Sequence, residues 1–211
     1  MTPRSLLERG LEQLALKIPV PACEKLLSYV ELLAKWNRTY NLTAIRDPSR
    51  MVTHHLLDSL AVVPHLPMRA SDRLADAGSG AGLPGVPLAI VRPEWRVTLN
   101  EASEKKAAFL RQAAIELKLE NVAVHCARVE TWRPESTFTV VISRAFTEIA
   151  RFFECCRHLL SPDGALAAMK GAYPGAELSR LPAGCDCNLV IPLAVPHLRA
   201  QRHLVLCRVG P

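Results

Sequence analysis

Apolar side chains in the first third of the chain recur at the three- and four-residue spacing of amphipathic helices. Two such stripes are Leu6, Leu7, Leu11 and Leu14, and then Leu26, Leu27, Val30, Leu33 and Ala34. Segment 18–22, which holds two prolines, separates them. A further helix is predicted to begin after Asp47-Pro48-Ser49 and to run to Val63, because proline suits the first helical turn. Residues 1–70 are therefore predicted to form an N-terminal helical cap.

The pattern changes at Arg73, where short apolar runs begin to alternate with segments of helical length. Strands are predicted at residues 74–77, 96–99, 122–126, 138–143 and 165–169, with helices at 83–91, 103–119 and 147–160. Such alternation is typical of parallel strands connected by right-handed crossovers. Two final runs, 188–195 and 203–209, are close enough in sequence to pair as an antiparallel edge.

These elements predict an α/β fold. A Rossmann-like domain over residues 71–211, with a mostly parallel seven-stranded sheet and helices on both faces, would form one compact unit with the cap of residues 1–70. The length of 211 residues suits one core with an appendage. The composition, with 49% hydrophobic and 22% charged residues, excludes a disordered or fibrous protein.

Charge and hydropathy indicate the expected cellular location and binding partners of the chain. No apolar run reaches the roughly 18 residues of a membrane span, and charges stand where the apolar core of a signal peptide would lie. We therefore expect a cytoplasmic protein without a membrane partner, and a monomer by default. The formal net charge of +6 fits a polyanionic partner such as nucleic acid, but it does not identify one by itself.

The seven cysteines show no paired spacing of the kind that binds zinc or performs redox chemistry. They are Cys23, Cys126, Cys155, Cys156, Cys185, Cys187 and Cys207. An odd number without a CxxC pair predicts free, mostly buried thiols and no metal site.

A glycine-rich loop follows the first predicted strand and precedes a helix. Its sequence is Asp76-Ala-Gly78-Ser79-Gly80-Ala-Gly82. This is where open α/β sheets bind nucleotides, since glycine lets the backbone approach a ligand closely. A dinucleotide fingerprint would place its third glycine at Leu83, so the spacing disfavours a nicotinamide-dependent enzyme. The loop instead resembles the first motif of S-adenosylmethionine-dependent methyltransferases, while a tight turn that binds nothing is the alternative.

Acidic residues follow the second and third predicted strands. Glu101 lies 19 residues beyond Gly82, where a carboxylate can accept hydrogen bonds from ribose hydroxyls. It also begins the sequence Glu101-Ala-Ser-Glu104, so a helix N-terminus is the alternative. Val129 and Glu130 lie where they would approach the adenine, or form a surface turn.

Six segments carry a further resemblance: residues 36–43 (WNRTYNLT), 55–59 (HLLDS), 76–87 (DAGSGAGLPGVP), 143–146 (SRAF), 169–171 (MKG) and 202–204 (RHL). In them the chain resembles the bacterial glucose-inhibited division protein B family, which methylates N7 of a guanine in 16S ribosomal RNA. The resemblance covers most of the chain and implies a class I methyltransferase fold, S-adenosylmethionine as cofactor, and cofactor contacts at Gly78, Leu83, Val129, Glu130 and Arg144. The family usually has Asp at the position of Glu101, and apolar residues at those of Asn100 and Ser103.

The chemistry of this target predicts a site that positions the guanine and does not need to remove a proton from it. N7 of guanine has a free lone pair, so no general base is expected. The end of the fourth strand, Ser143-Arg144-Ala145-Phe146, lacks the Asn/Asp-Pro-Pro-aromatic motif of amine methyltransferases, and no cysteine follows a proline as pyrimidine chemistry would need. Arg144 is the candidate catalytic residue, as a clamp on a carboxylate or on the base, with a structural ion pair as the alternative. Phe146 would stack on a flipped guanine or belong to the core.

The remaining candidates concern RNA and the cap. Basic residues that could contact phosphates are Lys105, Lys106, Arg111, Lys170, Arg199 and Arg202. His55 and Asp58 lie three apart on a predicted helix and are expected to form a structural hydrogen-bonded pair. Two other functions stay open at this point: a nicotinamide-dependent oxidoreductase, and a non-catalytic RNA-binding assembly factor with the same fold.

Overall fold

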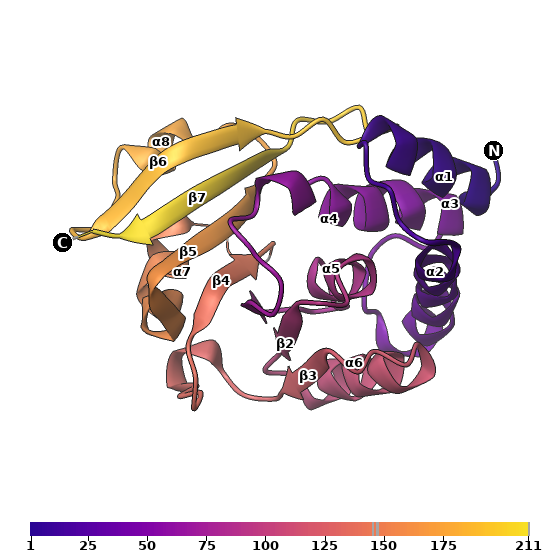
Figure 1. Cartoon of the computed structure of the whole chain (residues 1–211), viewed down its shortest axis with the longest axis horizontal. Helices are drawn as coiled ribbons and strands as arrows, with labels where there is room; N and C mark the ends of the chain where they lie inside the picture. Colours follow the sequence, from indigo (N-terminus) through magenta and orange to yellow (C-terminus); the bar gives the residue numbers. More distant parts are fainter. Residues whose placement is uncertain (145, 147, 211) are drawn as a thin grey trace.

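The computed structural model describes residues 1–144, 146 and 148–210, and it places one seven-stranded sheet between two helical layers (Figure 1). The strands are β1 (Arg73–Ala77), β2 (Arg96–Asn100), β3 (Val122–His125), β4 (Phe138–Ser143), β5 (Leu160–Lys170), β6 (Cys185–Pro192) and β7 (His203–Val209). Their order across the sheet is β3-β2-β1-β4-β5-β7-β6. Neighbours from β3 to β5 are parallel, and β7 is antiparallel to both β5 and β6. The predicted α/β class and antiparallel edge are confirmed.

The cap contains α1 (Pro3–Gln13), α2 (Val20–Tyr40) and a third helical stretch of mixed geometry. That stretch runs through α3 (Pro48–Met51), the π-helix η1 (Val52–Leu57) and α4 (Asp58–Leu60), followed by the 3-10 turn η2 (Val63–His65). The Asp47 carboxylate accepts a hydrogen bond from the Arg50 backbone N–H at 2.8 Å, so the predicted helix start is confirmed.

Helices cover both faces of the sheet. They are α5 (Gly85–Val91), α6 (Glu104–Glu116), α7 (Ile149–Cys156) and α8 (Gly175–Leu178), with the 3-10 turns η3 (Val129–Thr131) and η4 (Arg157–Leu159). Alternate strand residues supply two cores: Leu74 and Val140 pack with α1, α2, α5 and α6, whereas Ala75 and Val141 pack with α7. The cap therefore shares one core with a face of the sheet.

Several boundaries differ from the sequence-based prediction. Strand β6 begins at Cys185 rather than at residue 188, and helix α7 ends at Cys156 rather than at residue 160. Strand β5 begins at Leu160 rather than at residue 165, because segment 160–164 continues along β4 beyond a register shift between Phe138 and Val140. Helix α5 begins at Gly85 rather than at Leu83, because the turn of the glycine loop continues through residues 83 and 84. No helix among the described residues is long and apolar enough to cross a membrane.

The prediction of free thiols is wrong for two of the seven cysteines. Cys187 of β6 and Cys207 of β7 form a disulfide, 20 residues apart in sequence. Residues on adjacent antiparallel strands become neighbours only when the strands pair, so a search for closely spaced cysteines does not find them. The other five are free, and of these Cys23, Cys155 and Cys156 are buried.

Candidate functional site

The glycine loop lies at the carboxyl end of β1, between β2 and β4. Gly78, Gly80 and Gly82 have φ values of 70°, 59° and 87°, which glycine adopts without a steric penalty. The Ser79 backbone N–H donates to the Asn100 carbonyl at 2.9 Å, and the Tyr29 hydroxyl donates to the Ala81 carbonyl. The sheet and the cap thus hold the loop from two sides. Because β1 pairs with both β2 and β4, this is the switch point at which open α/β sheets bind ligands.

Asp76 is buried beneath this loop. Its Oδ2 accepts from the Gly85 backbone N–H at 2.9 Å, whereas Oδ1 has no hydrogen-bond partner among the described residues. Burial raises the pKa of Asp76 to about 7, although the Gly85 hydrogen bond acts in the opposite direction. A Cβ atom on Gly85 would lie 2.7 Å from Asp76 Oδ2, so the helix start and the carboxylate need a glycine to come this close. The unpaired oxygen is suited to a cationic or hydrogen-bonding ligand.

Glu101 joins the end of β2 to the glycine loop. Its Oε2 accepts from the Gly80 backbone N–H at 2.9 Å, and its Oε1 accepts from the Ser103 backbone N–H at 2.8 Å. The contact with Ser103 is the one expected of a residue at a helix N-terminus. Glu101 also lines the cavity beside the loop, so this contact does not exclude a role in binding a ligand. The amide of Asn100 donates to the carbonyls of His125 and Ala127 and thereby ties β2 to the turn after β3.

Arg144 follows β4 and is held by the cap. Its Nη1 donates to the His54 carbonyl at 3.2 Å and lies 3.4 Å from Asp58 Oδ2. The other carboxylate oxygen of Asp58 accepts from Arg202 Nε at 2.8 Å. The Asp58 side chain is only 3% exposed, against 29% for Arg144 and 24% for Arg202. One buried carboxylate therefore orients two guanidinium groups, one just after β4 and the other just before β7.

The predicted pair between His55 and Asp58 is wrong among the described residues. The His55 ring Nε2 lies 2.8 Å from Thr43 Oγ1, and Asp58 contacts the two arginines instead. Residues 52–57 form a π-helix, whose wider turn removes the alignment that residues three apart have in an α-helix. Burial, with a contribution from Arg144, lowers the pKa of His55 to about 4, so the ring is neutral near pH 7.

A cavity of about 350 Å³ lies between the loop, the cap and Arg144, within the roughly 300–1,000 Å³ common for small-molecule sites. It is lined by Leu42, Thr43, Gly78, Ser79, Gly80, Ala81, Leu83, Glu101, Lys106 and Arg144. The predicted cofactor residues among these are thus brought together, with Asp76 and Gly82 behind them in the loop.

Three predicted site residues contact other parts of the molecule and not the cavity. Val129 is buried in the core beneath α7, and the Glu130 carboxylate accepts from Arg151 at 3.1 Å. Neither is among the residues that line the cavity. The Phe146 ring lies 5.1 Å from the Phe152 ring and packs against the same core, as the structural alternative expected. The two neighbours of Phe146, Ala145 and Thr147, lie outside the described residues.

Comparisons with known proteins decide the family. Residues 22–205 match the family described as GidB, rRNA small subunit methyltransferase G. A relative from Chromobacterium violaceum, named ribosomal RNA small subunit methyltransferase G, is 51% identical over 199 residues, 94% of each chain. One of the same name from Methylobacillus flagellatus is 54% identical, over 94% of this chain and 95% of its own. The chain belongs to this family.

The fold also occurs in a solved methyltransferase. A structure described as a SAM-dependent methyltransferase from Aquifex aeolicus superposes with a TM-score of 0.59 over 84% of this chain and 98% of that one. The two sequences are 20% identical, so the likeness concerns the fold. It agrees with the predicted class I methyltransferase architecture of the GidB family.

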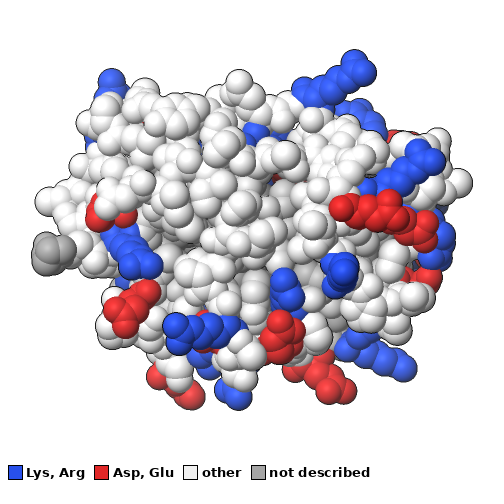
Figure 2. Space-filling model, turned by 45° about the horizontal axis from the view of Figure 1, so that its top comes forward, with Lys and Arg blue, Asp and Glu red and all other residues white. Residues whose placement is uncertain are grey.

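The basic residues proposed for RNA divide into two groups. Lys105, Lys106 and Arg111 lie on α6, where Arg111 is 3.5 Å from Glu104. Lys170, Arg199 and Arg202 lie at or near the edge where β5 ends and β7 begins, since Lys170 pairs with His203 in the sheet. Lys170 is largely buried and lies 2.8 Å from the Glu177 carboxylate, so it also has a structural contact. Lys and Arg are mixed with acidic side chains around a broad uncharged area in Figure 2.

Sequence reasoning missed the part of the cavity that the cap supplies. Leu42 and Thr43 line it, and the loop that carries them is held by Asn37, whose side chain accepts from the Thr43 backbone N–H at 2.9 Å and donates to the Ile45 carbonyl at 3.3 Å. The signal was present, because these residues lie in or next to segment 36–43, which resembles the GidB family. The resemblance alone gave no direction for their side chains.

Proposed function

We propose that the chain transfers a methyl group from S-adenosylmethionine to N7 of a guanine in 16S ribosomal RNA. The observation that carries this proposal is the cavity at the carboxyl end of β1, where the glycine loop faces Arg144. Membership in a family whose relatives are named ribosomal RNA small subunit methyltransferase G supports the substrate class. We further propose that the chain acts in the cytoplasm, as a monomer.

The residues around the cavity fit S-adenosylmethionine. We assign its contacts to the lining residues Gly78, Ser79, Gly80, Leu83, Glu101 and Arg144. We also assign contacts to Asp76, Gly82, Val129 and Glu130, which lie outside the lining of the cavity. When bound, the cofactor supplies a methyl group activated by a sulfonium. The Glu101 carboxylate would accept from ribose hydroxyls, Asp76 Oδ1 would face a cationic group, and the Arg144 guanidinium would hold a carboxylate.

Arg144 and its neighbours would position the acceptor base. N7 carries a lone pair at neutral pH, so alignment rather than proton removal supplies the acceleration. Arg202 would extend this positioning, because Asp58 fixes both guanidinium groups at one edge of the sheet. Lys105, Lys106, Arg111, Lys170 and Arg199 are proposed to contact RNA phosphates.

Methyl transfer from labelled S-adenosylmethionine to small ribosomal subunits that lack the modification tests this function. Label is expected at a single guanine, and mapping the modified nucleotide identifies it. The two alternative functions predict different results: an oxidoreductase would be stabilised against heat by NAD rather than by S-adenosylhomocysteine, and an assembly factor would bind RNA without binding the cofactor. Absence of label in 16S RNA from well-folded protein would reject the proposal.

The buried Asp76 predicts a pH dependence of cofactor affinity. Its pKa of about 7 means that the carboxylate is protonated below that pH, whereas a cationic ligand favours the ionised form. Affinity should therefore rise from about pH 6 to about pH 8, by up to about tenfold per pH unit below the pKa. Calorimetry over this range checks it. The Asp76→Asn variant should bind the cofactor more weakly, and its affinity should not depend on pH. The control is Asp72→Asn, just before the first residue of β1, which should keep the pH dependence.

A further inference from the structure

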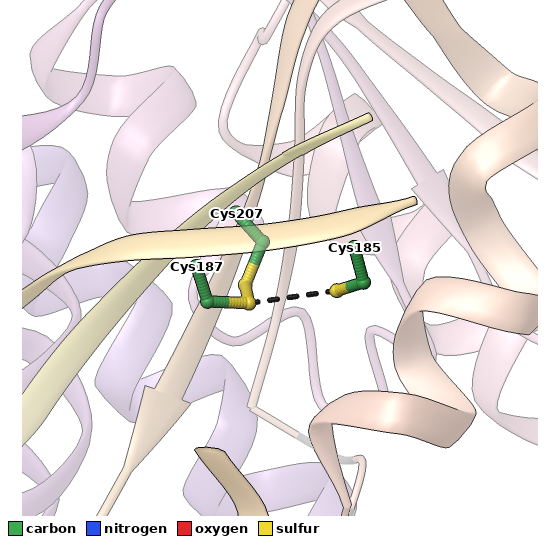
Figure 3. A group of neighbouring side chains, drawn as sticks. All are labelled: Cys185, Cys187 and Cys207. Atoms are coloured by element: carbon green, nitrogen blue, oxygen red, sulfur yellow. Dashed lines mark hydrogen bonds between the residues drawn. A yellow bond between two sulfur atoms is a disulfide. The ribbon is translucent and has the colours of Figure 1, made fainter. Parts of the chain in front are cut away.

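Three cysteine side chains meet on the β6–β7 hairpin. The Sγ atoms of Cys185, Cys187 and Cys207 all lie within 4.8 Å of one another. Cys187 and Cys207 form a disulfide, and Cys185 Sγ lies 3.5 Å from Cys187 Sγ (Figure 3). The third thiol thus points at the disulfide rather than into solvent. A disulfide needs two cysteines, so the third one has no part in closing it.

Strand geometry explains why the three sulfurs converge. Cys185 and Cys187 are two residues apart on β6 and so share a face of the hairpin. Cys207 lies on β7, two residues before Val209, which pairs with Cys185. Between the pairs Asp186–Arg208 and Leu189–Leu206, β6 has one residue more than β7, so the bulge places Cys187 and Asn188 opposite Cys207.

The cluster has access to solvent. Cys185 and Cys187 are partly buried and line a surface cavity of about 560 Å³, while Cys207 is buried beneath them. The other lining residues are Tyr173, Leu178, Leu181, Asp186, Asn188 and Val190. None of these residues lines the cavity beside the glycine loop. Cys207 is four residues along β7 from His203, roughly 13 Å from the edge that carries Arg202.

We propose that Cys185, Cys187 and Cys207 bind one thiophilic metal ion of the zinc class when the disulfide is reduced. Two sulfurs bound to one Zn²⁺ at about 2.3 Å lie at most about 4.6 Å apart, so the observed spacing needs only small side-chain rotations. Three thiolates select zinc or Cu(I) over magnesium and calcium, which prefer oxygen. The cavity leaves room for water as a fourth ligand.

The disulfide and the metal-bound form exclude one another. A dithiol reductant donates two electrons and two protons to the Cys187–Cys207 bond, which breaks to give two thiols while the dithiol closes to its own disulfide. Binding of the metal then forms three metal–sulfur bonds and releases up to three thiol protons to solvent. When the disulfide is closed, Cys185 is the one thiol donor left in this cluster, which is too few for a stable site.

Metal titration of the full chain in both redox states tests the proposal without any substitution. Reduced, oxygen-free protein should bind one equivalent of Zn²⁺ against a chromophoric chelator, and Cd²⁺ should give the ultraviolet charge-transfer absorbance of metal–thiolate bonds. The oxidised chain should bind at least about 100-fold more weakly. Equal affinity in the two states, or no binding by the reduced chain, overturns the proposal.

Substitutions locate the ion. Cys185→Ser leaves the disulfide in place and should weaken Zn²⁺ binding by the reduced chain at least about tenfold, and Cys187→Ser should do the same. Cys126→Ser is the matched control, since Cys126 is also a partly buried free thiol but lies outside the cluster. The assignment would be overturned if Cys126→Ser lowered the Zn²⁺ affinity and Cys185→Ser left it unchanged. This inference is independent of the proposed methyl transfer.

Discussion

Replacing Asp58 with asparagine is expected to lower kcat/KM for methyl transfer about 10- to 100-fold. The carboxylate accepts hydrogen bonds from Arg144 and Arg202, and an amide nitrogen in its place would face one guanidinium donor with another donor. A hydrogen bond to a charged group contributes about 1.5–3 kcal/mol, which corresponds to that range of rates. Asp58 acts through the arginines, so it is a positioning residue.

Steady-state kinetics with small ribosomal subunits, together with calorimetry of cofactor binding, measures the effect. We expect kcat to fall more than the cofactor affinity, because both arginines are proposed to hold the base. Glu24→Gln is the control: it neutralises the carboxylate that lies 2.6 Å from Arg4 in an exposed ion pair of the cap, and it should leave the kinetics unchanged. A folded Asp58→Asn enzyme with unaltered kcat/KM would contradict the proposed role.

Substitution of Gly78 by aspartate is expected to weaken S-adenosylmethionine binding by at least about 100-fold, or about 2.8 kcal/mol. Gly78 lines the cavity, so the new side chain would occupy the space that is proposed to hold the cofactor. It would also bring a second carboxylate to the cavity that Glu101 lines. Calorimetry with the cofactor and with S-adenosylhomocysteine measures the loss.

Gly184→Asp separates this effect from backbone strain. Gly184 has a φ of 77°, close to the 70° of Gly78, and an added Cβ there would meet nothing within 4 Å. Both variants therefore pay a similar conformational cost, whereas only the Gly78 variant obstructs the cavity. Retained cofactor binding by Gly78→Asp would show that the site has been placed wrongly.

The sequence predicts the sheet well because strands buried on both faces are mostly apolar. Segment 138–143 is apolar apart from Thr139 and Ser143, and residues 74–77 are apolar apart from Asp76. The glycine loop was predictable for a different reason: its position follows from the order of strand, turn and helix.

What the sequence does not predict depends on contacts between distant residues. The π-helical turn at residues 52–57 redirects His55 toward Thr43 and leaves Asp58 to Arg144 and Arg202, which are 86 and 144 residues away. The Cys187–Cys207 disulfide likewise exists only because β6 and β7 pair. Helical periodicity contains no information about such partners.

The position of β7 between β5 and β6 has a consequence for the timing of activity. A nascent chain acquires the cap, the glycine loop and Arg144 long before the ribosome adds residues 202–209. Until then β5 and β6 lack their common neighbour, and Asp58 has one arginine instead of two. Competence for catalysis should therefore arise only after residues 202–209 have been added and β7 has paired with β5 and β6.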